Sequence, residues 1–166
     1  MADKKILEKA YKLAFKYEAE RGSCPQCVYS AIMEALDIGN PDAVQAADGL
    51  AGGTALSTEG TCGALAGGIM AISSVVGRTY EDFSSGEGKR RIFQYSNMLY
   101  KKFIEEYGSI VCKDIHMMLF GRTFDLMDPK DYQDFEKMGA HLDKCPGVSG
   151  KVARWTAEII LDYLKK

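Results

Sequence analysis

The chain has 166 residues, of which 46% are hydrophobic and 27% charged, as expected for one folded domain with an ordinary buried core. A formal net charge of −2 gives no electrostatic case for a nucleic-acid partner or an acidic membrane surface. No apolar run approaches the roughly 20 residues of a membrane-spanning helix. The chain begins with a charged segment that has no signal-peptide core, so we expect a cytoplasmic protein whose cysteines are catalytic groups or metal ligands.

The first half of the chain predicts helices separated by glycine-rich turns. Apolar residues recur at three- and four-residue spacing over residues 6–17, which indicates an amphipathic helix. A second helix is predicted over residues 24–36 and a short third one over residues 42–50. Residues 62–76 are apolar and rich in small side chains. Because glycine weakens a helix by about 1 kcal/mol against alanine, this helix is expected to be buried, with its backbone close to another helix or a bound group.

The second half of the chain predicts four more helices. A long amphipathic helix is expected from Lys89 to residue 107, and shorter ones over residues 110–120 and 129–138. The last helix is expected over residues 149–164. No segment shows the alternation of a strand. The pattern therefore predicts an all-α, single-domain helical bundle of about six to eight helices that spans residues 1–166.

The cysteines are the residues that point to chemistry. Five are present, and Cys24, Cys62, Cys112 and Cys145 each lie near a predicted helix end or start. A helix N-terminus carries partial positive charge and unpaired N–H groups, so we expect it to lower the pKa of a thiol and favour the thiolate, which is both nucleophile and metal ligand. The alternative is that these cysteines are small buried hydrophobic residues.

Two local motifs leave alternatives open. Cys24-Pro-Gln-Cys27 at a helix start is the local pattern of thiol–disulfide oxidoreductases. A helix rather than a strand precedes it, which disfavours a thioredoxin fold, and the spacing also suits two metal ligands. His116 lies four residues after Cys112, on the same helix face. It is a candidate ligand, a base for that thiol, or an ordinary core residue.

The cysteine motifs resemble those of the C_GCAxxG_C_C family, to whose members redox activity is ascribed. The segment SCPQCV at Cys24 resembles the first motif, and TCGALAGG at Cys62 resembles the central glycine-rich one. Cys112 and Cys145 match the two later lone cysteines. The resemblance implies a helical domain in which these four cysteines act, and a related domain of split-Soret-type cytochromes implies an iron–sulfur centre. The central motif departs from the family by reading Cys-Gly-Ala, and Cys27 is an extra cysteine.

Three hypotheses follow. The first is electron transfer or redox sensing through an iron–sulfur cluster, or zinc, held by the four family-matched cysteines. Gly63 and Gly67 would then be cofactor-binding positions that bring backbone N–H groups to the sulfurs. The second is metal-free thiol–disulfide catalysis, in which Cys24 attacks and Cys27 or Cys62 resolves. The third is a helical interaction protein with incidental cysteines.

Partners follow from the first hypothesis. An electron-transfer protein requires a redox partner protein, and no covalent haem is expected because Cys-x-x-Cys-His is absent. The aromatic-rich segment over residues 93–103 could pack against a second copy in a homodimer, and core packing explains it equally well.

Overall fold

A computed structural model of the chain describes residues 2–88 and 90–166, and over these residues the fold is all-α, as predicted. Nine α-helices are present in this part of the chain: α1 (Ala2–Arg21), α2 (Cys24–Leu36), α3 (Pro41–Ala47), α4 (Gly63–Val76), α5 (Tyr80–Ser84), α6 (Arg91–Tyr107), α7 (Cys112–Phe120), α8 (Pro129–Lys137) and α9 (Cys145–Leu164). A 3₁₀ turn, η1 (Asp48–Leu50), follows α3. A π-helical turn, η2 (Ala140–Lys144), leads into α9.

Several boundaries differ from the prediction by a few residues, and two differences matter most. Helix α9 begins at Cys145, four residues before the predicted start, because Pro146 occupies the first turn, where no backbone N–H is required. Helix α5 was not predicted. It is a single short turn stabilised by a capping box between Thr79 and Asp82. The predicted helix start at Lys89 lies outside the described residues.

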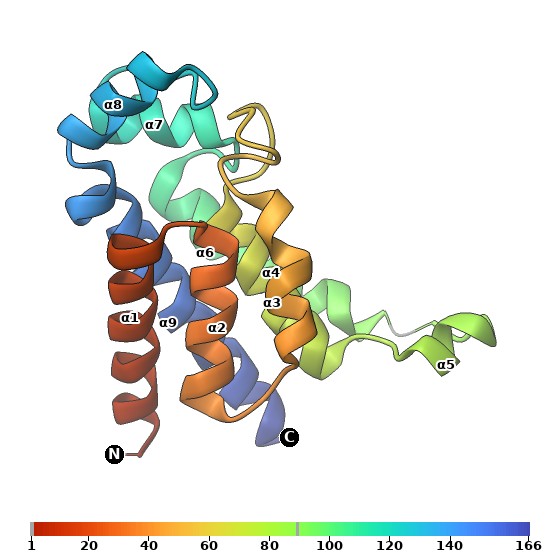
Figure 1. Cartoon of the computed structure of the whole chain (residues 1–166). Helices are drawn as coiled ribbons and strands as arrows, with labels where there is room; N and C mark the ends of the chain where they lie inside the picture. The colour runs from red at the N-terminus through yellow and green to blue at the C-terminus, as the bar shows by residue number, and fades with distance from the viewer. Residues whose placement is uncertain (1, 89) are drawn as a thin grey trace.

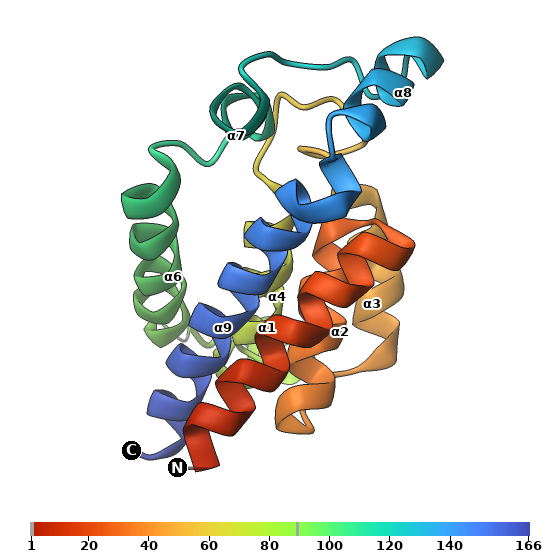
Figure 2. The same cartoon turned by 90° about the vertical axis from the view of Figure 1, so that its left-hand side faces the viewer.

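The core of the bundle is formed by α1, α2, α4 and α9, and α6 packs beside α4 and α9 (Figures 1 and 2). Small residues in α4 allow the close approach that the sequence predicted. A Cβ atom on Gly67 would lie 2.4 Å from the Pro25 carbonyl oxygen, and one on Gly68 would lie 2.7 Å from Thr156 Oγ1. On α6, Phe103 is fully buried in this core, whereas Phe93 is 73% exposed.

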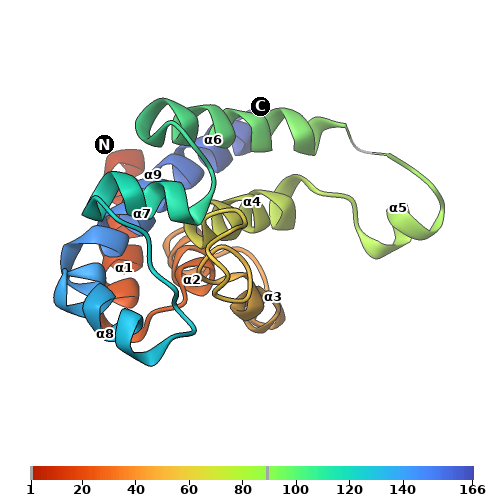
Figure 3. The same cartoon turned by 90° about the horizontal axis from the view of Figure 1, so that it is seen from above.

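Helices α7 and α8 and turn η2 cover one end of the bundle, and both chain termini lie at the other end (Figures 1 and 2). A second, smaller hydrophobic cluster holds this cap together; its buried members are Phe124, Leu126, Phe135 and Ala140. The segment around α5 extends away from the bundle (Figure 3). None of the described helices is both long and apolar enough to cross a membrane.

The glycine-rich stretch contains a left-handed turn. Five consecutive residues, 52–56, have positive φ, and three of them are not glycine: Thr54 (71°), Ala55 (52°) and Leu56 (58°). The turn is held by backbone hydrogen bonds, including Ala55 N–H to the Gly49 carbonyl at 2.8 Å. Left-handed backbone costs a non-glycine residue about 1–2 kcal/mol, so this loop is strained.

This strain predicts an unusual response to glycine. We expect Ala55→Gly to raise the free energy of unfolding by about 0.5–1 kcal/mol, because the relief of left-handed strain exceeds the entropy that glycine adds to the unfolded chain. Ala19 is an exposed residue within α1, and Ala19→Gly should lower stability by about 1 kcal/mol. Urea denaturation of both variants measures the difference, and loss of stability in Ala55→Gly would contradict it.

Candidate functional site

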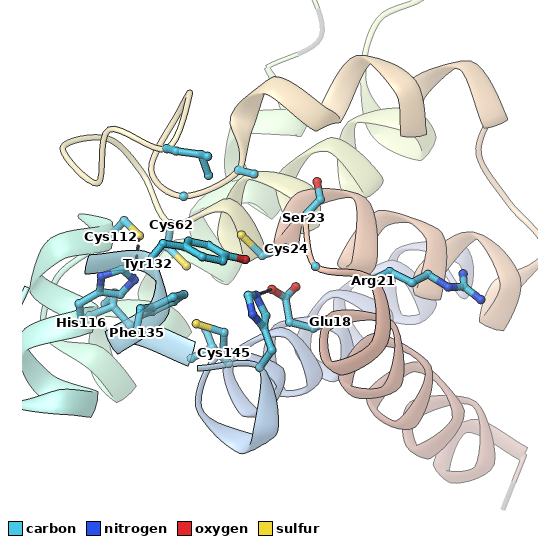
Figure 4. A pocket seen from close by; sticks show the side chains of 17 residues that line it. Glu18, Arg21, Ser23, Cys24, Cys62, Cys112, His116, Tyr132, Phe135 and Cys145 are labelled. Atoms are coloured by element: carbon cyan, nitrogen blue, oxygen red, sulfur yellow. Dashed lines mark hydrogen bonds and ion pairs between the residues drawn. The ribbon is translucent and has the colours of Figure 1, made fainter. Parts of the chain in front are cut away.

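Four of the five cysteines line one cavity of about 210 Å³ beneath the α7–α8 cap (Figure 4). Each is delivered by a different helix start. Cys24, Cys112 and Cys145 are the first residues of α2, α7 and α9, and Cys62 immediately precedes α4. The structure therefore brings together four residues that are widely separated along the chain.

Backbone hydrogen bonds hold the segments that carry Cys62 and Cys112 side by side. The Cys62 N–H donates to the Ile110 carbonyl at 2.7 Å, and the Cys112 N–H donates to the Gly60 carbonyl at 2.9 Å. A single antiparallel β-bridge joins the same two segments. Both sulfurs are thus positioned by backbone pairing and do not depend on flexible side chains.

The glycines around Cys62 play different parts. A Cβ on Gly63 would lie 2.3 Å from Cys24 Sγ, so the absence of a side chain there lets the start of α4 approach this sulfur. Gly67, one turn later, packs against the backbone of Pro25 and does not line the cavity. The backbone N–H of Gly52, a residue not singled out from the sequence, acts to lower the pKa of Cys24. The glycine-rich stretch that contains Gly52 was the sequence feature that could have indicated its position at the site.

The electrostatics of the cavity differ from the expectation for helix starts. Burial raises the pKa of Cys62 to about 11, although the nearby backbone N–H groups of Ala64 and Leu65 act to lower it. Burial raises the pKa of Cys112 to about 12, with neighbouring Cys62 adding to the shift. The prediction of lowered thiol pKa values was wrong, because loss of hydration outweighs the helix N-terminus. At neutral pH these thiols are protonated unless a positively charged group joins them.

The pKa values of the other two cavity thiols, Cys24 and Cys145, are also raised by burial. Burial, followed by the nearby Glu18 carboxylate, raises the pKa of both Cys24 and Cys145 well above the ordinary value. Mutual repulsion contributes, because ionised Cys62 raises the pKa of each of them. Ionised Cys62 thus disfavours ionisation of the other three thiols of the cavity.

Cys27 belongs to a different environment from Cys24. Its thiol is 3% exposed, is absent from the cavity wall, and donates to the Gly22 carbonyl at 2.9 Å. Burial, reinforced by Glu18, raises the pKa of this thiol far above its usual range. All five cysteines are free thiols. The Cys-x-x-Cys motif thus places one sulfur in the cavity and the other against α1.

His116 forms part of the cavity wall. Its Nε2 lies 3.5 Å from Cys112 Sγ, as the four-residue spacing predicted. The ring is 3% exposed and contacts the aromatic rings of Phe120, Phe124 and Phe135. Burial lowers its pKa to about 4, so the imidazole is neutral at physiological pH. Within the described part of the chain its Nδ1 has no hydrogen-bond partner.

Sequence reasoning missed one further residue at the cavity, Glu18. Glu18 is 2% exposed, and its Oε2 accepts a hydrogen bond from Ser149 Oγ at 3.2 Å. Its Oε1 lies 3.6 Å from Nε2 of His141. The available signal was the four-residue spacing from Ala10 and Ala14, which places Glu18 on the buried face of α1.

The cavity is not shaped around one ion. Among the residues that the structure describes, no three His, Cys, Asp or Glu side chains are grouped closely enough to hold a single metal ion. The four thiols instead surround a space large enough for a polyatomic group.

The comparison with known proteins covers most of this site. The family model described as "Putative redox-active protein (C_GCAxxG_C_C)" matches residues 22–159, a range that contains all five cysteines and most residues that line the cavity, but not Glu18 and Arg21. The chain matches none of the curated proteins and none of the solved structures with which it was compared. The family match and the four cysteines in order agree, and the chain therefore belongs to the C_GCAxxG_C_C family.

Proposed function

We propose that Cys24, Cys62, Cys112 and Cys145 hold an iron–sulfur cluster through which the protein transfers electrons or senses redox state. The observation that carries this proposal is that four thiols from four separate helix starts line one buried cavity. When bound, such a cluster accepts and releases one electron at a time, which agrees with the redox activity ascribed to the family. A redox partner protein would supply and remove the electron.

The size of the cavity favours a cluster over zinc. A structural zinc ion needs its four ligands about 2.0–2.3 Å from a single point. Thiolates that bind a cluster are instead spread around several metal atoms. The cavity of about 210 Å³ has room for a group larger than one ion.

Backbone donors at the sulfurs support the same function. The backbone N–H of Gly52 lowers the pKa of Cys24, and those of Ala64 and Leu65 lower the pKa of Cys62, each against the larger effect of burial. Hydrogen bonds of this kind stabilise negative charge on sulfur and tune the reduction potential of an iron–sulfur centre. The aromatic cap formed by Phe135 and its neighbours limits the access of water to the cavity.

The raised thiol pKa values weigh against metal-free thiol chemistry. The thiolate is the attacking species in disulfide exchange, and burial raises the pKa of both Cys24 and Cys27. Buried thiols are, however, good ligands for a cationic centre, whose charge favours their deprotonation. Binding the centre then releases protons from the protein.

The test is purification and reconstitution without oxygen, followed by iron and sulfide analysis and visible absorption spectroscopy. We expect a coloured protein with iron and acid-labile sulfide, whose absorption changes when dithionite reduces it. A chelator with an oxidant should bleach it. One zinc per chain without sulfide would overturn the proposal, and so would a colourless protein that forms a Cys24–Cys27 disulfide under mild oxidant.

A further inference from the structure

A buried carboxylate forms part of the cysteine cavity without a lysine or arginine partner in any described ion pair. Glu18 comes from the last turns of α1, and Figure 4 shows it at the same cavity as Cys24 and Cys145. Its side chain accepts a hydrogen bond from the hydroxyl of Ser149, and the thiol of Cys27 lies close by. A buried carboxylate without a lysine or arginine partner is costly when ionised, so it is a ready acceptor for a proton.

A row of polar groups connects this carboxylate with the surface. His141 Nε2 lies 3.6 Å from Glu18 Oε1, and the other ring nitrogen, Nδ1, is hydrogen-bonded to Glu136. Exposure increases along the row, from 3% for the Glu18 side chain to 22% for His141 and 38% for Glu136. An imidazole that contacts one carboxylate through each nitrogen can receive a proton on one side and release it on the other.

The local backbone positions this imidazole. His141 lies on the π-helical turn η2, and this turn ends directly before Cys145. Turns of this kind occur frequently at functional sites. Gly22 lies next to the ring, since a Cβ atom built on Gly22 would be 3.8 Å from Nε2 of His141. The same short segment therefore delivers one cavity sulfur and the imidazole that contacts Glu18.

We propose, resting on the function proposed above, that Glu18 takes up a proton each time an electron enters the cavity, and that Glu136 and His141 relay this proton from water. An electron that arrives from the one-electron donor protein would reduce the centre held by the four cavity cysteines and so add one negative charge beside Glu18. One proton leaves water, and one O–H bond forms on the Glu18 carboxylate. The donor protein is oxidised by one electron, the net charge of the cavity is unchanged, and oxidation reverses both transfers.

Other charged and titratable groups surround Glu18. They are Arg21 on its own helix, Cys24 and Cys27 on α2, Cys62 before α4, Cys112 on α7, Tyr132 and Glu136 on α8, His141 on η2 and Cys145 on α9. Burial raises the pKa of Glu18, and the charge of His141 is the largest opposing influence. Because Glu18 alone among these is a buried carboxylate that lines the cavity, it is the group expected to respond to an added electron.

Glu18→Gln tests the inference, because it removes the titrating group while keeping its size. In the reconstituted wild-type protein the equilibrium constant for one-electron reduction should fall about tenfold per unit rise in pH across the range in which Glu18 titrates. The constant should not depend on pH in Glu18→Gln. The control is Glu20→Gln, which removes the same charge from an exposed position on the same helix and should behave as wild type.

His141→Gln tests the relay. It should leave proton uptake coupled to reduction at equilibrium, but should slow that uptake about a hundredfold, the lower end of the range for a lost proton-transfer group. An unchanged rate would overturn the role of His141. In the metal-free protein, carbon NMR should show one glutamate carboxyl, absent in Glu18→Gln, that titrates above the ordinary value of about 4.3.

A failure of the proton-uptake inference can be distinguished from a failure of the proposed function. If the wild-type protein assembles no centre, the proposed function falls and this inference falls with it. If a centre assembles but its reduction is independent of pH, or if the pH dependence persists in Glu18→Gln, the inference alone is wrong. A Glu18 carboxyl that titrates at or below the ordinary glutamate value in the metal-free protein would also overturn it.

Discussion

Cys62→Ser is expected to abolish the iron and sulfide content of protein reconstituted without oxygen, whereas Cys27→Ser should leave both unchanged. Cys62 is one of the four sulfurs at the cavity, whereas Cys27 is not among the residues that line it and donates to the Gly22 carbonyl. Loss of even an outer-shell partner typically costs 10–100-fold in metal affinity, so loss of a ligand should cost at least about a hundredfold. Iron and sulfide analysis with visible absorption measures the difference.

The two substitutions are closely matched. Both replace a buried thiol by a hydroxyl, at side chains that are 7% exposed for Cys62 and 3% for Cys27. Any general loss of stability should therefore be similar, and circular dichroism of both variants checks that they remain folded. Equal iron content in the two variants would contradict the assignment of the cavity as the centre. Loss of iron from Cys27→Ser alone would place the centre at the Cys-x-x-Cys motif.

Gly67→Ala is expected to lower the free energy of unfolding by about 1–3 kcal/mol. A Cβ there would lie 2.4 Å from the Pro25 carbonyl oxygen, and backbone cannot move aside as a flexible side chain can. Helices α2 and α4 would have to separate, although alanine is the better helix former. Urea denaturation measures the effect.

Gly147→Ala is the matched control for Gly67→Ala. Gly147 also lies within a helix, but nothing is within 4 Å of a Cβ built there. Its replacement should leave stability unchanged or raise it by up to about 1 kcal/mol. Equal stability of the two variants would show that the contact between α2 and α4 relaxes at little cost.

The sequence by itself determined the helices and the placement of the cysteines along them. Apolar spacing and terminal residues are local signals, so the all-α fold and most boundaries followed from them. The same signals placed Cys24, Cys62 and Cys112 at helix starts. The start of α9 at Cys145 was missed, because Pro146-Gly147 resembles a turn although proline is also favoured in a first helical turn.

Only the tertiary structure decided which of these groups share an environment. The cavity exists because the packing of α1, α2, α4 and α9 brings four distant helix starts under one cap. The same packing leaves Cys27 outside the cavity wall and buries Glu18. It also raises the thiol pKa values, which the sequence predicted to be lowered. Hydration and mutual repulsion depend on what surrounds a group in space, and the local sequence around each cysteine does not contain that information.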